Sequence, residues 1–239
     1  MDIKKHLTVK ISRGDTPDAE ATYLVPWRDN QTVLDVVTEI QQRIDPSLAY
    51  RFSCRVGVCG SCAMMVNGAP RWACRTHVSR VEKQGTLRLA PLRNLPRVKD
   101  LVVDMREFFD KWQAAGGHFR SSATRADAPA RVDPQSEPRQ RASEAIECIN
   151  CAICYAACDV VAWDKNYLGP AALNRAWTQL NDERHADRNH VKKRVGSAGG
   201  VSACHTEGTC MQCCPIGLSP TRSIAGLKKV TLFQWFLKE

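Results

Sequence analysis

The alternation of apolar and polar residues along the first hundred positions predicts a small, mixed β domain. Residues 7–11 alternate, and residues 22–27 form a second run with strand character. Asn67 and Gly68, a dipeptide typical of hairpin turns, separate residues 64–66 from the segment that ends at Cys74. Residues 86–89 form the last short strand. We expect this domain to occupy residues 1–104.

Helical spacing of apolar residues appears once within this domain and again after it. Thr32 and Asp35 have the spacing of a helix start. The apolar residues that follow recur at helical spacing and are predicted to be core: Leu34, Val37, Ile40 and Ile44. Residues 101–115 form an amphipathic pattern, and residues 116–143 are polar and rich in proline and arginine. We therefore expect a helix and a linker over residues 105–143.

The remainder, residues 144–239, is predicted to be an all-α domain. Pro170 suits the first position of a helix that continues through Leu180. Residues 182–195 are charged and predict a solvated helix, residues 196–200 predict a loop, and a final helix follows Pro220. The expected fold class is α+β, with a β domain first and a helical domain second.

Length and charge limit the classes of protein that the chain can represent. The 239 residues suffice for two modest domains, and no apolar run approaches the length needed to span a bilayer. The polar first six residues contain no apolar core of a secretory signal. Residues 71–99 carry eight basic residues and one acidic residue, within a net charge of +9. We interpret this stretch as a solvated face, with an acidic partner or anionic lipid as alternatives. Nucleic acid is set aside because no reading motif accompanies the charge.

Twelve cysteines in a chain without an evident export signal indicate metal ligands rather than disulfides. The first group has the plant-type [2Fe–2S] spacing C-x4-C-x2-C followed by a distant cysteine: Cys54, Cys59, Cys62 and Cys74. Gly57 and Gly60 let the loop fold tightly and direct backbone N–H groups at the cluster sulfurs. A four-cysteine zinc site is the alternative, although zinc sites favour two C-x2-C pairs.

A second group of cysteines has the spacing of bacterial two-cluster ferredoxins. The first run, C-x2-C-x2-C-x3-C, covers residues 148–158; the second, residues 204–215, repeats it with Glu207 in place of the second cysteine and Pro215 after the last. Because the fourth cysteine of each run serves the other cluster, the predicted [4Fe–4S] ligands are Cys148, Cys151, Cys154 and Cys214. The predicted [3Fe–4S] ligands are Cys158, Cys204 and Cys210. Cys213 is left over, and we expect it to be a buried or partner-facing thiol that binds no cluster.

These two constellations, in this order, resemble the iron–sulfur subunit of succinate dehydrogenase and quinol:fumarate reductase over nearly the whole chain. The resemblance is carried by residues 53–62, 99–104 (Lys-Asp-Leu-Val-Val-Asp), 148–158, 167–171 (Tyr-Leu-Gly-Pro-Ala) and 204–215. It implies a β-grasp plant-type [2Fe–2S] ferredoxin domain followed by an α-helical bacterial-type ferredoxin domain. It also implies a flavoprotein partner carrying FAD, one or two membrane-anchor subunits, a quinone, and a peripheral position on the cytoplasmic face of the bacterial inner membrane.

The family implies an electron relay from flavin through [2Fe–2S], [4Fe–4S] and [3Fe–4S] to quinone, in which no side chain of this chain is catalytic. Trp163 and His205 match the positions of the family's quinone-site residues. Asp159 stands where the family usually has proline. Glu207 replaces a residue that is usually small or apolar, and either points away from the cluster or acts as a fourth ligand. Fumarate reduction as the main direction, a free-standing electron carrier and a reductase with another acceptor are the competing hypotheses.

Overall fold

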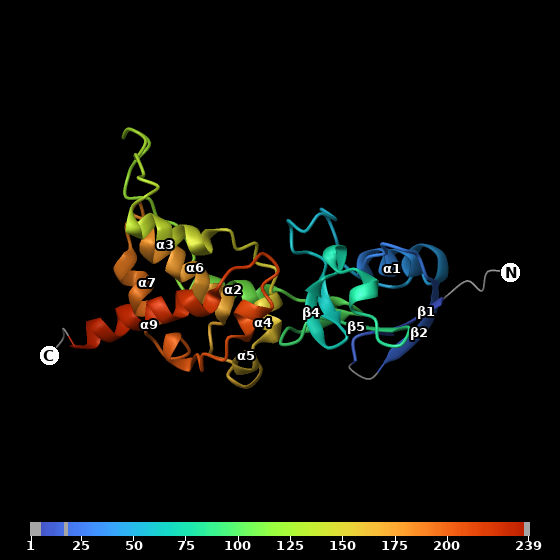
Figure 1. The fold of residues 1–239 in the computed structure, drawn as a ribbon. Coiled ribbons are helices and arrows are strands. Elements are labelled where there is room, and N and C mark those ends of the chain that lie inside the picture. Colours follow the sequence, from blue (N-terminus) through green and yellow to red (C-terminus); the bar gives the residue numbers. More distant parts are fainter. Residues whose placement is uncertain (1–5, 17–18, 237–239) are drawn as a thin grey trace. The chain divides into compact units, whose positions relative to one another are not determined.

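The computed structural model describes residues 6–16 and 19–236 and divides the chain into two compact units (Figure 1). The first unit comprises Met1–Met105 with Ile149–Ala157, and the second comprises Arg106–Cys148 with Cys158–Glu239. Two predictions concern residues outside the described ranges. The expected lack of a secretory signal depends on residues 1–5, and the predicted last helix ends within residues 237–239. No helix in the described part is long and apolar enough to cross a membrane.

A five-stranded mixed sheet forms the core of the first unit. Its strands are β1 (His6–Ser12), β2 (Glu20–Pro26), β3 (Ala63–Val66), β4 (Ala69–Trp72) and β5 (Thr86–Ala90), in the order β2-β1-β5-β3-β4. The pairing of β1 with β5 is parallel and the other pairings are antiparallel. Asn67 and Gly68 both have positive φ and form the predicted hairpin turn between β3 and β4.

The first helix is stabilised at its start as the sequence predicts, but its end differs. In α1 (Val33–Glu39), Thr32 and Asp35 form a reciprocal capping box, and Leu34 and Val37 are buried. The chain then widens into the π-helical turn η1 (Ile40–Ile44). The wider turn changes the angular spacing between residues four apart. Ile44 is 46% exposed, so its prediction as core was wrong.

The Lys-Asp-Leu-Val-Val-Asp stretch forms a second, two-stranded sheet around a buried carboxylate. Its strands are β6 (Arg97–Lys99) and β7 (Val102–Val103). Between them Asp100 has φ +49° and is 1% exposed. Its carboxylate accepts hydrogen bonds from the Arg13 guanidinium at 2.6 Å, from Gly14 N at 2.6 Å and from Ala49 N at 2.7 Å. One side chain thus ties three separate segments of the unit together.

Residues 149–157 pack against the sheet of the first unit, although they follow it by more than 40 residues in sequence. Their helix α4 (Ile153–Ala157) contacts β4. Asn94 adds a hydrogen bond from its side-chain amide to the carbonyl of Tyr155 at 3.0 Å. This packing unit therefore differs from the division of the sequence at residues 104 and 143, which stays a prediction.

The second unit is helical and is built around α6 (Pro170–Asn181). Almost every residue of α6 is buried, because α3 (Glu137–Ile146), α9 (Pro220–Phe236), α7 (Arg188–Val195) and α2 (Arg106–Ala114) pack around it (Figure 1). The remaining helices are α5 (Asp159–Trp163), α8 (Thr209–Gln212) and the 3-10 turn η4 (Val201–Ala203); the first unit has two such turns, η2 (Ala73–Arg75) and η3 (Val78–Arg80). Pro170 occupies the predicted first turn of α6.

Three predictions about helices after residue 100 were wrong. The helix expected from residue 101 begins at Arg106, because residues 102–103 belong to a strand. Part of the expected linker is α3, whose N-cap Ser136 accepts a hydrogen bond from Arg139 N. The start of the charged 182–195 stretch is not helical, and Asp182 is buried. Its carboxylate binds Arg184 and Arg139, and these bonds hold the pKa of Asp182 well below its usual value.

Candidate functional site

The loop at residues 54–62 surrounds the Cys54 thiol with backbone donors. Three N–H groups point at its sulfur: Val58 at 3.3 Å, Val56 at 3.4 Å and Cys59 at 3.3 Å. These bonds lower the pKa of Cys54 to about 6. Several N–H groups directed at a sulfur are the arrangement that stabilises a thiolate and tunes a bound cluster, so this loop suits a [2Fe–2S] centre.

Two of the other three thiols of this set are buried. Cys62 ends the loop and Cys74 lies in η2, and both are buried. Ala73 N donates to the Cys62 carbonyl at 3.1 Å, which joins the two segments. Burial raises the pKa of Cys62 to about 12. A buried thiol of this kind ionises when a metal binds it, so the donor set fits a cluster once iron is bound.

Two glycines let the loop approach its neighbours closely. Gly57 and Gly60 have φ +77° and +73°. A Cβ added at Gly57 would lie 3.1 Å from the Trp72 ring, and one added at Gly60 would lie 2.6 Å from Cys151 Cβ. The loop of the first cysteine set therefore contacts a predicted ligand of the next cluster directly, within one packing unit.

The predicted [4Fe–4S] ligands are divided between the two units. Cys151 and Cys154 belong to the first unit, and Cys148 and Cys214 belong to the second. Asn150 and Ala152 flank Cys151 with φ +56° and +60°. Left-handed, non-glycine residues on both sides of one cysteine are uncommon outside functional loops. This quartet stays a prediction from spacing.

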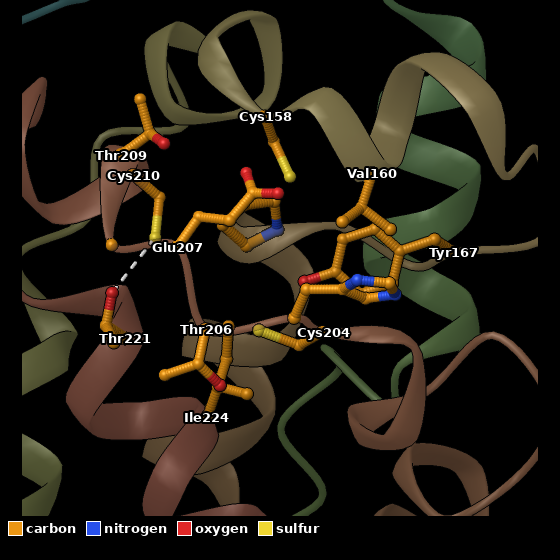
Figure 2. Close-up of a pocket in the computed structure, with 13 residues that line it drawn as sticks. Cys158, Val160, Tyr167, Cys204, Thr206, Glu207, Thr209, Cys210, Thr221 and Ile224 are labelled. Atoms are coloured by element: carbon orange, nitrogen blue, oxygen red, sulfur yellow. Dashed lines mark hydrogen bonds between the residues drawn. The ribbon is translucent and has the colours of Figure 1, made fainter.

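The three predicted [3Fe–4S] thiols, Cys158, Cys204 and Cys210, line one pocket of the second unit (Figure 2). The pocket contains about 340 Å³ of space, part of it open to solvent. Burial raises the pKa of both Cys158 and Cys210, and the two thiols are close enough to Cys204 to interact with it electrostatically. Three soft donors gathered in a partly enclosed pocket fit a [3Fe–4S] cluster.

Two hydroxyl side chains support this pocket, and a lysine anchors its loop. Cys210 Sγ lies 3.3 Å from Thr221 Oγ1 of α9. Burial raises the pKa of the Tyr167 hydroxyl, and the neighbouring Cys204 thiol raises it further. Lys228 donates to the Cys204 carbonyl at 2.7 Å and to Thr206 Oγ1 at 3.1 Å. The sequence did not single out Thr221 or Lys228, because α9 is far from the cysteine runs along the chain. Tyr167 did appear in the Tyr-Leu-Gly-Pro-Ala motif, without a role.

The predicted quinone-site residues lie together beside this pocket. His205 lines it, and the rings of Trp163 and His205 meet edge to face with centroids 5.8 Å apart. Trp163 is 60% exposed. Glu207 also lines the pocket, whereas Asp159 is exposed at the start of α5 and is not among the lining residues. The structure therefore brings together Trp163, His205 and Glu207, but not Asp159.

No three His, Cys, Asp or Glu side chains in the described ranges converge closely enough to hold a single metal ion. A multi-iron cluster shares its ligands among several irons, so its thiolates lie farther apart than those around one ion. The three clusters are therefore assigned from the spacing of the cysteines, the backbone donors around Cys54 and the pocket that Cys158, Cys204 and Cys210 share.

Comparison with known proteins agrees with this organisation. Residues 8–110 match the family described as "2Fe-2S iron-sulfur cluster binding domain", and residues 147–219 match "4Fe-4S dicluster domain". The chain is 36% identical to the fumarate reductase iron-sulfur subunit of Mycobacterium tuberculosis (strain CDC 1551 / Oshkosh), over 89% of each protein. It is also 36% identical to the mitochondrial succinate dehydrogenase [ubiquinone] iron-sulfur subunit 1 of Oryza sativa subsp. japonica, over 94% of this chain and 82% of that protein.

A solved structure shares the fold over almost the full length. A chain of the Mycobacterium smegmatis Sdh1 complex in the apo form superposes with a TM-score of 0.85, at 26% identity and 98% coverage of both chains. The expected order of a [2Fe–2S] domain followed by a helical dicluster domain is thereby confirmed. The chain belongs to the family of iron–sulfur subunits of fumarate reductase and succinate dehydrogenase.

Proposed function

We propose that the chain relays single electrons between the FAD of a flavoprotein partner and a quinone held with membrane-anchor subunits. The observation that carries the proposal is the shared pocket of Cys158, Cys204 and Cys210, with the Trp163–His205 pair beside it. Bound iron–sulfur clusters would supply one-electron steps, at potentials set by cluster type, burial and hydrogen bonds to sulfur.

Each set of cysteines has its own role in this relay. Cys54, Cys59, Cys62 and Cys74 hold the [2Fe–2S] cluster, and the N–H groups around Cys54 favour negative charge on its sulfur. Cys148, Cys151, Cys154 and Cys214 hold the [4Fe–4S] cluster. Cys158, Cys204 and Cys210 hold the [3Fe–4S] cluster, for which Thr221 and Tyr167 provide hydrogen-bonding groups beside the sulfurs.

Quinone is the proposed acceptor beside the third cluster. The exposed Trp163 presents an indole N–H donor, and His205 can donate a hydrogen bond or a proton to a quinone oxygen. Both residues lie in the helical unit together with the [3Fe–4S] thiols. The proposal places the chain as a peripheral subunit on the cytoplasmic face of a bacterial inner membrane, docked on anchor subunits that hold the quinone.

Replacing His205 with glutamine or Trp163 with phenylalanine should lower quinone reduction by succinate about 10–100-fold, which corresponds to the loss of a hydrogen bond to a charged or polarised group. In the same purified complex, succinate oxidation with an artificial dye that takes electrons at the flavin should keep its wild-type rate. His190→Gln, an exposed histidine of α7 away from the pocket, is the matched control. Unchanged quinone reduction in both variants would contradict the quinone site.

The proposed relay can carry electrons in either direction. The relatives are named after both reactions, succinate oxidation and fumarate reduction. Fumarate reductase subunits are among them, which favours quinol:fumarate reduction as a second candidate activity. The ratio of succinate oxidation to fumarate reduction in the intact complex, with the quinone poised oxidised or reduced, distinguishes the two.

A further inference from the structure

Glu207 occupies the position of a cluster ligand in the sequence. The first cysteine run places its members at residues 148, 151, 154 and 158, and the second places Cys204, Glu207, Cys210 and Cys214 at the same intervals. Glu207 thus stands in register with Cys151. The interval alone does not determine whether the carboxylate faces the pocket. The backbone conformation on either side of Glu207 determines it.

The backbone around Glu207 repeats the backbone around Cys151. Thr206 and Gly208, on either side of Glu207, have φ +63° and +80°; Asn150 and Ala152, on either side of Cys151, have φ +56° and +60°. A left-handed conformation is strained for a β-branched residue such as Thr206. Two Lys228 hydrogen bonds, to the Cys204 carbonyl and to Thr206 Oγ1, stabilise this turn. The residues on either side of Glu207 therefore have the same left-handed backbone as those on either side of Cys151, a predicted cluster ligand.

The Glu207 carboxylate is directed among the three thiols. Figure 2 shows the Glu207 side chain extending into the pocket between Cys158 and Cys210. Within residues 6–16 and 19–236, Glu207 makes no hydrogen bond or ion pair. The cation that binds this loop, Lys228 of α9, donates to neutral oxygens instead. A carboxylate beside three thiols, with no cation paired to it, is a donor available to a metal ion.

We infer that Glu207 is the protein ligand of a fourth, exchangeable iron at the pocket of Cys158, Cys204 and Cys210. In the reduced state the three-iron cluster takes up one ferrous ion: [3Fe–4S]0 and Fe2+ combine to [4Fe–4S]2+, so no electron is gained or lost in the uptake itself. A Glu207 carboxylate oxygen replaces a water on the incoming iron. Because a carboxylate is a harder and weaker ligand for cluster iron than a thiolate, this iron leaves again on oxidation.

The inference rests on the proposed assignment of the three thiols, and one experiment separates the two. The intact complex is purified anaerobically, reduced with dithionite, incubated with Fe2+ and freed of unbound metal, and its iron content and EPR spectrum are measured. We expect reduced wild type to gain about one iron per chain and to lose the parallel-mode EPR signal of its reduced three-iron cluster. Oxidation with a chelator should remove the added iron and return the signal of the oxidised three-iron cluster. Glu207→Ala and Glu207→Gln should neither gain iron nor lose the parallel-mode EPR signal.

Two further variants complete the test. Cys213→Ser should take up iron as wild type does, which excludes the neighbouring Cys213 thiol as the ligand. Glu207→Cys completes the four-cysteine spacing and should retain the fourth iron even after oxidation. Equal uptake by wild type and Glu207→Ala, or no fourth iron in Glu207→Cys, would overturn the inference and leave the three-thiol assignment intact. Absence of any three-iron signal in every variant, before and after iron is added, would instead overturn that assignment.

Discussion

Replacing Asp100 with alanine is expected to lower the free energy of unfolding of the first unit by about 3–5 kcal/mol, as for other buried ion pairs that lose one partner. The carboxylate is 1% exposed and accepts from the Arg13 guanidinium and from two backbone N–H groups, those of Gly14 and Ala49. Without it, the two N–H groups stay buried and unpaired, and Arg13 keeps only its bonds to Asp45 and Ser47.

Two further variants separate the effect of removing a buried carboxylate from the effect of removing a negative charge. Asp100→Asn keeps the shape but offers a single acceptor oxygen to three donors, so it should also destabilise, by less than alanine does. Glu20→Ala, in the same unit, removes a carboxylate that pairs with Lys10 and Arg88 at the surface, and should cost less than about 1 kcal/mol. Urea unfolding of the purified chain gives the three midpoints. Equal midpoints for Asp100→Ala and Glu20→Ala would contradict this role for Asp100.

Replacing Gly60 with alanine is expected to displace the segment around Cys151 and to destabilise the first unit by more than a positive φ alone explains. The left-handed backbone adds about 1–2 kcal/mol for alanine. The new Cβ would lie 2.6 Å from Cys151 Cβ and 3.0 Å from its Cα, and relieving such an overlap in a packed site costs about another 1–3 kcal/mol.

Gly85 provides the matched control for this substitution. It has the same φ of +73°, but a Cβ added there would meet nothing within 4 Å. Gly85→Ala should therefore show only the backbone effect. Because Cys151 is a predicted [4Fe–4S] ligand, Gly60→Ala should also alter the EPR line shape of that cluster, whereas Gly85→Ala should leave it unchanged. Identical stabilities and spectra for the two variants would mean that the close contact with Cys151 has no energetic effect.

The sequence was most informative where spacing alone determines the chemistry. The intervals between cysteines predicted which thiols share a site, and the structure gathers Cys158, Cys204 and Cys210 in one pocket. The Thr32–Asp35 box and the Asn67-Gly68 turn were predicted because each depends on neighbouring residues only. A capping box or a hairpin turn can be predicted from a few neighbouring residues.

Features that depend on distant residues were not predictable. The polar stretch before residue 144 contains α3 because α6 buries its Ala142 and Ala145 face, and nothing within the stretch indicates this. Asp182 was expected on a solvated face but is buried against Arg139, which is 43 positions earlier. The direction of the Glu207 side chain depends on the φ angles of its two neighbours, which residue types alone do not fix.

The central claim, that the chain holds three clusters of different type, is tested most directly by low-temperature EPR with iron and zinc analysis of the anaerobically purified complex. We predict about nine irons per chain and no stoichiometric zinc, from two, four and three irons in the three sites. A three-iron signal in the oxidised sample should give way, on stepwise reduction, to signals of a [2Fe–2S] and a [4Fe–4S] cluster. Stoichiometric zinc with little iron, and no cluster signal at any stage of reduction, would contradict the account.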